Sequence, residues 1–173
     1  MVPSMNASTI RSAYGMWPQY NRRLRDVVAA MTDKQLAIRP SPERWPIWAT
    51  VGHTAAMRPY WLCDVMGVPG GEATPFPPGS DIDWADDLDH PRGADELVLA
   101  LDSTFQLIEG CLNGWTIDML SDTFDRNYNG ELQVHTRGSI LQRMLTHDAY
   151  HCGELSQTLG IHDLPQIDLW RPD

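Results

Sequence analysis

Hydrophobic side chains recur at intervals of three and four residues in four long stretches of the chain, and this spacing places them on one face of an α-helix. The stretches are residues 10–31, 46–66, 95–115 and 137–159. The segments between them lack this period. The pattern therefore predicts four amphipathic helices.

Proline and glycine mark where these helices should bend or end. Proline removes a backbone donor and clashes with the preceding turn, so the first helix should kink or restart at Pro18 and the second should bend near Pro59. Gly160 follows the fourth stretch at the position where a C-terminal cap prefers glycine.

The segment between the third and fourth stretches, residues 116–136, is mixed in character. It contains Asn129-Gly130, a strong turn signal, so a short hairpin could form there. No set of strands is present that could build a sheet core. We therefore predict an all-α fold, a four-helix bundle in one domain over residues 1–173, with a C-terminal tail at 161–173.

The second and third helices are separated by a connection that is rich in proline, glycine and acidic residues. Between Glu72 and Glu96 lie eight acidic residues and one basic residue, Arg92, and their net charge of −7 accounts for most of the total of −10. We interpret residues 67–92 as one long surface crossover loop. It is either a solvated connection or a lid over an active site.

Composition excludes several classes of function. The acidic balance argues against nucleic-acid binding, which needs a basic face. No apolar run approaches the roughly 20 residues that cross a bilayer. The N-terminus shows no secretory signal pattern, and three scattered cysteines give no disulfide framework. We therefore expect a cytoplasmic protein that binds neither nucleic acid nor membrane.

Histidines supply the candidate chemistry. His147 and His151 are four residues apart, hence on one face of the fourth helix, and two imidazoles so placed can bind one divalent ion. His53 lies in a strongly apolar part of the second helix. Three histidines from two facing helices could hold a metal ion and leave positions open for water or substrate. The alternative is that they are satisfied core side chains.

Three segments resemble the DinB-like superfamily of bacterial metal-binding four-helix bundles. The last of them resembles the family signature His-x3-His-x-Gly-Gln-Leu. The segments are Met31–Leu36 with Arg39–Trp45, Val51–Ala55 and His147–Leu155. The resemblance spans most of the chain and implies a metal triad of His53, His147 and His151.

Two acidic residues near the signature are candidate catalytic residues. Glu154 stands where the family usually has glutamine, and it could add charge to the metal site, act as a base, or be exposed or salt-bridged. Asp148 gives an echo of the His-Glu-x-x-His zinc peptidase pattern. It is rotated about 100° from His147 on the helix, so we favour the role of a buried polar or supporting residue over that of a general base.

The resemblance implies an enzyme, because relatives include thiol S-transferases and a maleylpyruvate isomerase that use a low-molecular-weight thiol. We expect Zn or Ni, with Mn or Fe as alternatives, to activate a bound thiol or water toward a small-molecule substrate, and we expect a homodimer. The sequence does not distinguish a thiol transferase from a hydrolase. The alternative is a non-catalytic metal-binding or dimerising bundle in a stress response.

Overall fold

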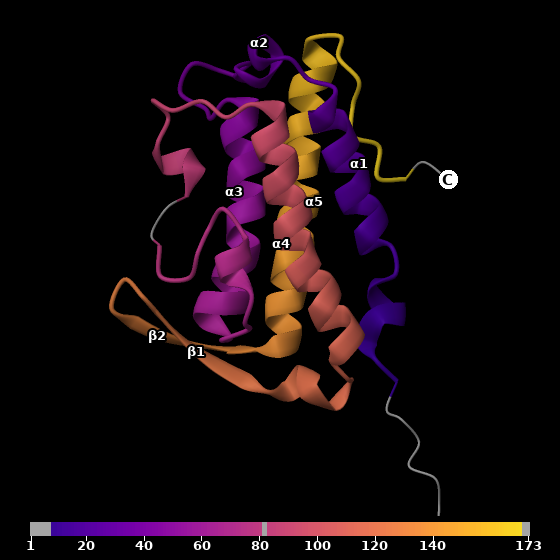
Figure 1. Cartoon of the computed structure of the whole chain (residues 1–173), viewed down its shortest axis with the longest axis vertical. Coiled ribbons are helices and arrows are strands. Elements are labelled where there is room, and N and C mark those ends of the chain that lie inside the picture. The colour runs from indigo at the N-terminus through magenta and orange to yellow at the C-terminus, as the bar shows by residue number, and fades with distance from the viewer. Residues whose placement is uncertain (1–7, 81–82, 171–173) are drawn as a thin grey trace, which may run out of the picture.

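Four long helices lie side by side in the computed structural model, which describes residues 8–80 and 83–170 (Figure 1). They are α1 (Trp17–Ala29), α3 (Ile47–Pro59), α4 (Ala94–Gly114) and α5 (Arg137–Ile161), and a single turn, α2 (Asp33–Leu36), precedes α3. Helix α4 packs against α1 and α3, and α3 also packs against α5. The mostly helical fold predicted from the hydrophobic spacing is confirmed.

A two-stranded antiparallel sheet corrects the all-α prediction. Strand β1 (Thr123–Tyr128) pairs with β2 (Glu131–Thr136), and Figure 1 shows this hairpin crossing the end of the helices where α5 begins. Asn129 and Gly130 have φ values of 53° and 81°, the left-handed backbone that a tight hairpin turn requires. The hairpin is thus an addition to the helical fold, and the four long helices are all present.

The prolines act as expected from their missing backbone donor. A short 3₁₀ helix, Ile10–Tyr14, comes first, and α1 then begins at Trp17 with Pro18 in its first turn, where no donor is needed. Helix α3 ends at Pro59 and continues as a π-helix, Tyr60–Val65, because proline interrupts the regular bonding of the α-helix.

Gly160 is not the C-terminal cap that the sequence suggested. Helix α5 continues to Ile161, and the left-handed residue that follows it is Asp163, with φ of 56°. A Cβ atom on Gly160 would lie 2.9 Å from the Gln166 side chain. Glycine at this position leaves room for the Gln166 side chain, because the C-terminal segment folds back on the helix.

The connection from the π-helix to α4 is partly buried. It contains two short 3₁₀ helices, Gly71–Ala73 and Trp84–Asp86, and the side chains of Phe76 and Trp84 enter the core. A Cβ atom on Gly52 of α3 would lie 3.0 Å from the Trp84 ring, so glycine allows this close approach. The segment is thus more than a surface loop. Asp81 and residues 1–7 and 171–173, part of the predicted tail, lie outside the described residues.

The interior consists of two apolar clusters with a polar layer at their boundary. On α3, α4 and α5 the boundary falls at Arg58, Thr104 and Asp148, with apolar core residues on either side. The Arg58 guanidinium donates to Asp148 Oδ2 at 2.9 Å and to the Thr104 hydroxyl at 3.4 Å. The indole of Trp17 donates to the same Asp148 oxygen at 2.9 Å. The buried charges are therefore paired and hydrogen-bonded, as a buried ion pair requires.

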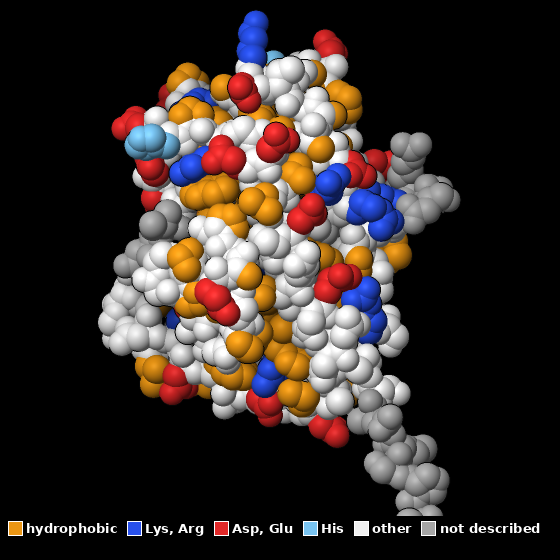
Figure 2. Space-filling model, viewed as in Figure 1, with side chains coloured by type: hydrophobic (Ala, Val, Ile, Leu, Met, Phe, Trp, Pro, Cys, Tyr) orange, Lys and Arg blue, Asp and Glu red, His pale blue; other side chains and the backbone are white. Residues whose placement is uncertain are grey.

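The visible surface is mixed in character. Acidic, basic and apolar side chains are interspersed over the face in Figure 2. Within residues 8–80 and 83–170, no helix combines the length and apolar character that a membrane span needs.

Candidate metal centre

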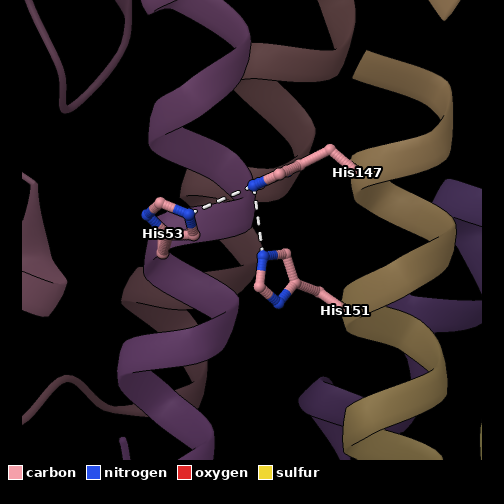
Figure 3. Close-up of side chains that lie close together, drawn as sticks. All are labelled: His53, His147 and His151. Atoms are coloured by element: carbon pink, nitrogen blue, oxygen red, sulfur yellow. Dashed lines mark hydrogen bonds between the residues drawn. The ribbon is translucent and has the colours of Figure 1, made fainter. Parts of the chain in front are cut away.

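Three imidazole rings point toward one another between α3 and α5 (Figure 3). The Nε2 atom of His147 lies 3.1 Å from Nε2 of His53 and 3.1 Å from Nε2 of His151. Two nitrogens on one tetrahedral zinc ion, each about 2.0–2.1 Å from it, lie roughly 3.3 Å apart. Both distances to His147 therefore fit a shared small divalent ion, and all three donor nitrogens lie within 4.8 Å of one another.

Helix geometry explains how the three side chains meet. His147 and His151 are one turn apart on α5, so their rings project from the same face. His53 projects from the middle of α3, and α3 and α5 are in direct contact. His151 is buried, whereas His53 and His147 are half-buried at the edge of the core. The sequence prediction brought these three residues together, and the structure places them together.

Carboxylates orient two of the three rings. The Nδ1 atom of His151 is hydrogen-bonded to Glu154 Oε2 at 2.8 Å, and Nδ1 of His53 is hydrogen-bonded to Asp83 Oδ2. The second Asp83 oxygen accepts the backbone N–H of Ala85 at 2.9 Å, which fixes the carboxylate. With the proton held on Nδ1, each Nε2 presents its lone pair to the shared point, the arrangement that supports a metal-bound histidine.

The electrostatics favour neutral imidazoles. Burial, followed by the neighbouring His151 and His53, lowers the pKa of His147 to about 3. Burial also lowers the pKa of His151, against the opposing effect of Glu154. Neutral imidazole is the form that binds metal, and several lone pairs directed at one point need a cation between them. The donor set therefore fits a bound divalent ion.

An open groove of about 640 Å³ adjoins the cluster, and His151 and Glu154 form part of its wall. That volume is in the range of pockets for small molecules. The Trp45 ring lies 4.9 Å from the His53 ring, between centroids, and also lines the groove. Among the described His, Cys, Asp and Glu residues, only the three histidines form a cluster of this kind. The site therefore combines a three-nitrogen donor set with room for a ligand.

The structure separates the two acidic candidates. Glu154 contacts His151 and lines the groove. Asp148 lies in the core, bound by Arg58 and Trp17, which agrees with its expected place as a buried polar residue. Asp83 was not identified from the sequence. It is 30 residues from His53 in an acidic run, and the neighbouring Trp84 packs against Gly52, next to His53 on α3.

The chain's own thiols do not supply a nucleophile. All three cysteines are buried. Burial raises the pKa of Cys63 to about 11, and those of Cys111 and Cys152 to about 12. They therefore remain protonated near neutral pH and pack as small apolar side chains.

Removing the Asp83 charge is expected to weaken metal binding. Asp83→Asn should lower the affinity for Zn²⁺ by about 10-fold to 100-fold, because the carboxylate orients His53 and increases the basicity of its ring. Asp87→Asn is the matched control, since Asp87 is an exposed acid in the same segment that contacts His90 instead. Competition with a coloured chelator measures both affinities. Equal affinities for the two variants would show that Asp83 does not support the site.

The metal-free protein is expected to lose stability as the pH falls below about 6.5. The unfolded chain protonates His147 near 6.5, whereas the folded chain does so only near 3, so the unfolded state binds more protons between these values. His147→Gln removes this contribution and should make the acid side of the stability curve less steep, while the lowered pKa of His151 leaves a residual slope. Urea unfolding with chelator at pH 7 and pH 5 measures the change. An identical pH dependence in wild type and variant would contradict the assignment.

Comparison with known proteins identifies relatives by family and by fold. The family model described as the DinB superfamily matches residues 19–155. A crystal structure of a DinB-like protein from Bacillus cereus superposes with a TM-score of 0.64 at 17% identity, over 92% of this chain and 96% of the other. A conserved protein from Enterococcus faecalis gives a TM-score of 0.60 at 20% identity, over 88% and 96%. No curated protein matches.

Proposed function

The chain belongs to the DinB superfamily, and on this premise we propose that it is a divalent-metal-dependent enzyme that activates a small thiol or water. The observation that carries the proposal is the convergence of three Nε2 atoms beside an open groove. A catalytic site keeps coordination positions for exchangeable ligands, whereas a structural zinc site is closed by four protein ligands. Three protein donors next to a groove fit the catalytic type.

His53, His147 and His151 would hold the ion, with Zn or Ni favoured by the three imidazole donors and Mn or Fe as alternatives. A bound divalent ion lowers the pKa of a coordinated thiol or water, so that a nucleophile forms near neutral pH. Asp83 and Glu154 keep the proton of their partner ring on Nδ1. Both carboxylates thereby hold the donor atoms in the orientation that the ion needs.

Glu154 has a second role in this proposal. Its carboxylate lines the groove next to His151, so it is the acidic group placed to accept a proton from an incoming thiol or water. Asp148 serves as a positioning residue, because Arg58 and Trp17 bind its carboxylate in the core. The thiol of a transfer reaction would come from a small molecule, since the chain's cysteines are buried and protonated.

Elemental analysis of untagged protein purified without chelator is the first test. We expect about one divalent ion per chain. The loaded protein is then assayed for consumption of a low-molecular-weight thiol with a carbon electrophile, and for hydrolysis of a nitrophenyl ester. Activity that disappears with chelator and returns with the ion supports the enzyme, and the assay that responds separates thiol transfer from hydrolysis.

Two results would overturn the proposal. Protein that stays metal-free after incubation with Zn, Ni, Mn and Fe would make the histidines core side chains. An ion held without exchangeable ligands and without turnover in either assay would indicate a non-catalytic metal-binding bundle. Water exchange at the ion, measured by relaxation of solvent protons in the Mn-loaded protein, distinguishes the open from the closed site.

A further inference from the structure

Two arginine side chains lie over the indole ring of Trp61, next to the hairpin. The guanidinium carbon of Arg126 lies 4.8 Å from the centroid of Trp61, and that of Arg143 lies 5.1 Å from it. The ring of His135 packs against the same indole, 5.3 Å away between centroids. Residues of β1, β2, α5 and the π-helix thus bring two guanidinium groups and an imidazole around one indole ring.

Neither arginine has an acidic partner in the part of the chain that the structure describes. Arg126 donates only to neutral oxygens, to the Tyr60 hydroxyl at 2.7 Å and to Gln133 Oε1 at 3.1 Å. The guanidinium of Arg143 lies over the indole and forms no ion pair with a described carboxylate. Other arginines pair with carboxylates: Arg11 with Glu109, Arg25 with Asp102, Arg58 with Asp148, Arg92 with Glu96, and Arg137 with Asp122.

The chain has a net charge of −10, yet no described carboxylate pairs with either of these two cations. Like charges repel, and the cost falls when an anion lies between them. Burial lowers the pKa of His135, and the charges of Arg143 and Arg126 lower it further, as expected for an imidazole beside two guanidinium groups. Arg143 is exposed, so an anion from solvent can reach the cluster.

The existing contacts hold one arginine ready for an oxyanion. Its bonds to Tyr60 and Gln133 fix the guanidinium plane of Arg126 and leave other N–H donors available. Arg143 adds a second planar donor group. Fixed guanidinium forks match the oxygens of carboxylate and phosphate groups.

We propose that Arg126, Arg143 and His135 form a binding site for the phosphate or carboxylate group of a small molecule, with Trp61 as its floor. The site is built from the same two segments of the chain as the metal centre: Arg143 is four residues before His147 on α5, and Trp61 is eight residues after His53, in the π-helix that continues α3. A substrate with an anionic group could therefore be anchored here while its other end reaches the histidines. This last step rests on the proposed function, whereas anion binding itself does not.

The test is a titration of chelator-treated protein with inorganic phosphate and, separately, with succinate, at constant ionic strength set with sodium chloride. The indole N–H signal of Trp61, identified in ¹⁵N spectra by its loss in Trp61→Phe, reports binding. We expect a saturable shift in the millimolar range for at least one probe. The probe with the lower dissociation constant shows whether the site prefers phosphate or carboxylate. Because no metal is present, the result is independent of the metal site.

Variants locate the anion. Arg143→Gln should weaken binding at least fivefold and the double variant with Arg126→Gln should abolish it, while Arg143→Lys should retain part of it. Arg11→Gln is the control, because it removes the same charge from a surface pair with Glu109. A shift that does not saturate for either probe, or one that persists in the double variant, would overturn the site. Thermal unfolding of Arg143→Gln verifies that it is folded.

Discussion

Replacing His147 by alanine is expected to weaken the binding of Zn²⁺ by more than about a hundredfold, since loss of a ligand exceeds the 10-fold to 100-fold effect of losing a supporting residue. His147 is the central donor, with its Nε2 atom 3.1 Å from those of both other histidines. Without it, His53 and His151 would bind an ion through two donors that come from different helices. The protein itself should fold, because removing a half-buried imidazole leaves the apolar clusters intact.

The measurement is the zinc affinity by chelator competition, combined with the metal content after dialysis. His53→Ala and His151→Ala should show the same loss. His90→Ala is the matched control, because His90 is an exposed histidine whose ring contacts only Asp87. If any one of the three alanine variants kept its full metal content, that histidine would not be a ligand.

Helical periodicity accounts for the part of this site that the sequence could predict. The spacing of His147 and His151 is a local property, because four residues make about one turn wherever the helix lies. The position of His53 could be inferred only as a residue on a helix that packs in the same fold. That it shares one metal ion with His147 and His151 was one of two readings of its apolar helical position, and the family resemblance implied it.

Tertiary packing accounts for what the sequence did not reveal. Asp83 reaches His53 because the neighbouring Trp84 ring lies against Gly52, and neither the acidic run nor the glycine indicates that contact. The same holds for the hairpin. Asn129-Gly130 signalled the turn, but the pairing that sets Arg126 opposite Gln133 and above Trp61 depends on where the strands pack. Local sequence indicates whether a segment forms a helix or a hairpin. It does not indicate which other segments that element packs against.

The buried ion pair is expected to give the largest effect on stability. Asp148→Ala should lower the free energy of unfolding by about 3–5 kcal/mol, because it leaves a buried cation without a partner. The Arg58 side chain is 1% exposed and that of Asp148 is 9% exposed, so water cannot replace the lost carboxylate. The Trp17 indole would lose its acceptor as well.

The surface pair of Arg25 on α1 and Asp102 on α4 provides the control, because it likewise joins an arginine and an aspartate of two different helices but is about 40% exposed. Asp102→Ala should cost less than about 1 kcal/mol. Urea unfolding with chelator measures both variants without a contribution from bound metal.

Replacing both buried charges tests whether Asp148 acts through packing or through chemistry. The double variant Arg58→Met with Asp148→Leu should recover most of the lost stability, because no unpaired charge remains in the core. If Asp148 only positions α5, Asp148→Ala should also weaken zinc binding by displacing His147 and His151, and the double variant should restore that binding. Recovered stability without recovered zinc binding would contradict that role, because the carboxylate would then be needed for its effect on the metal site itself.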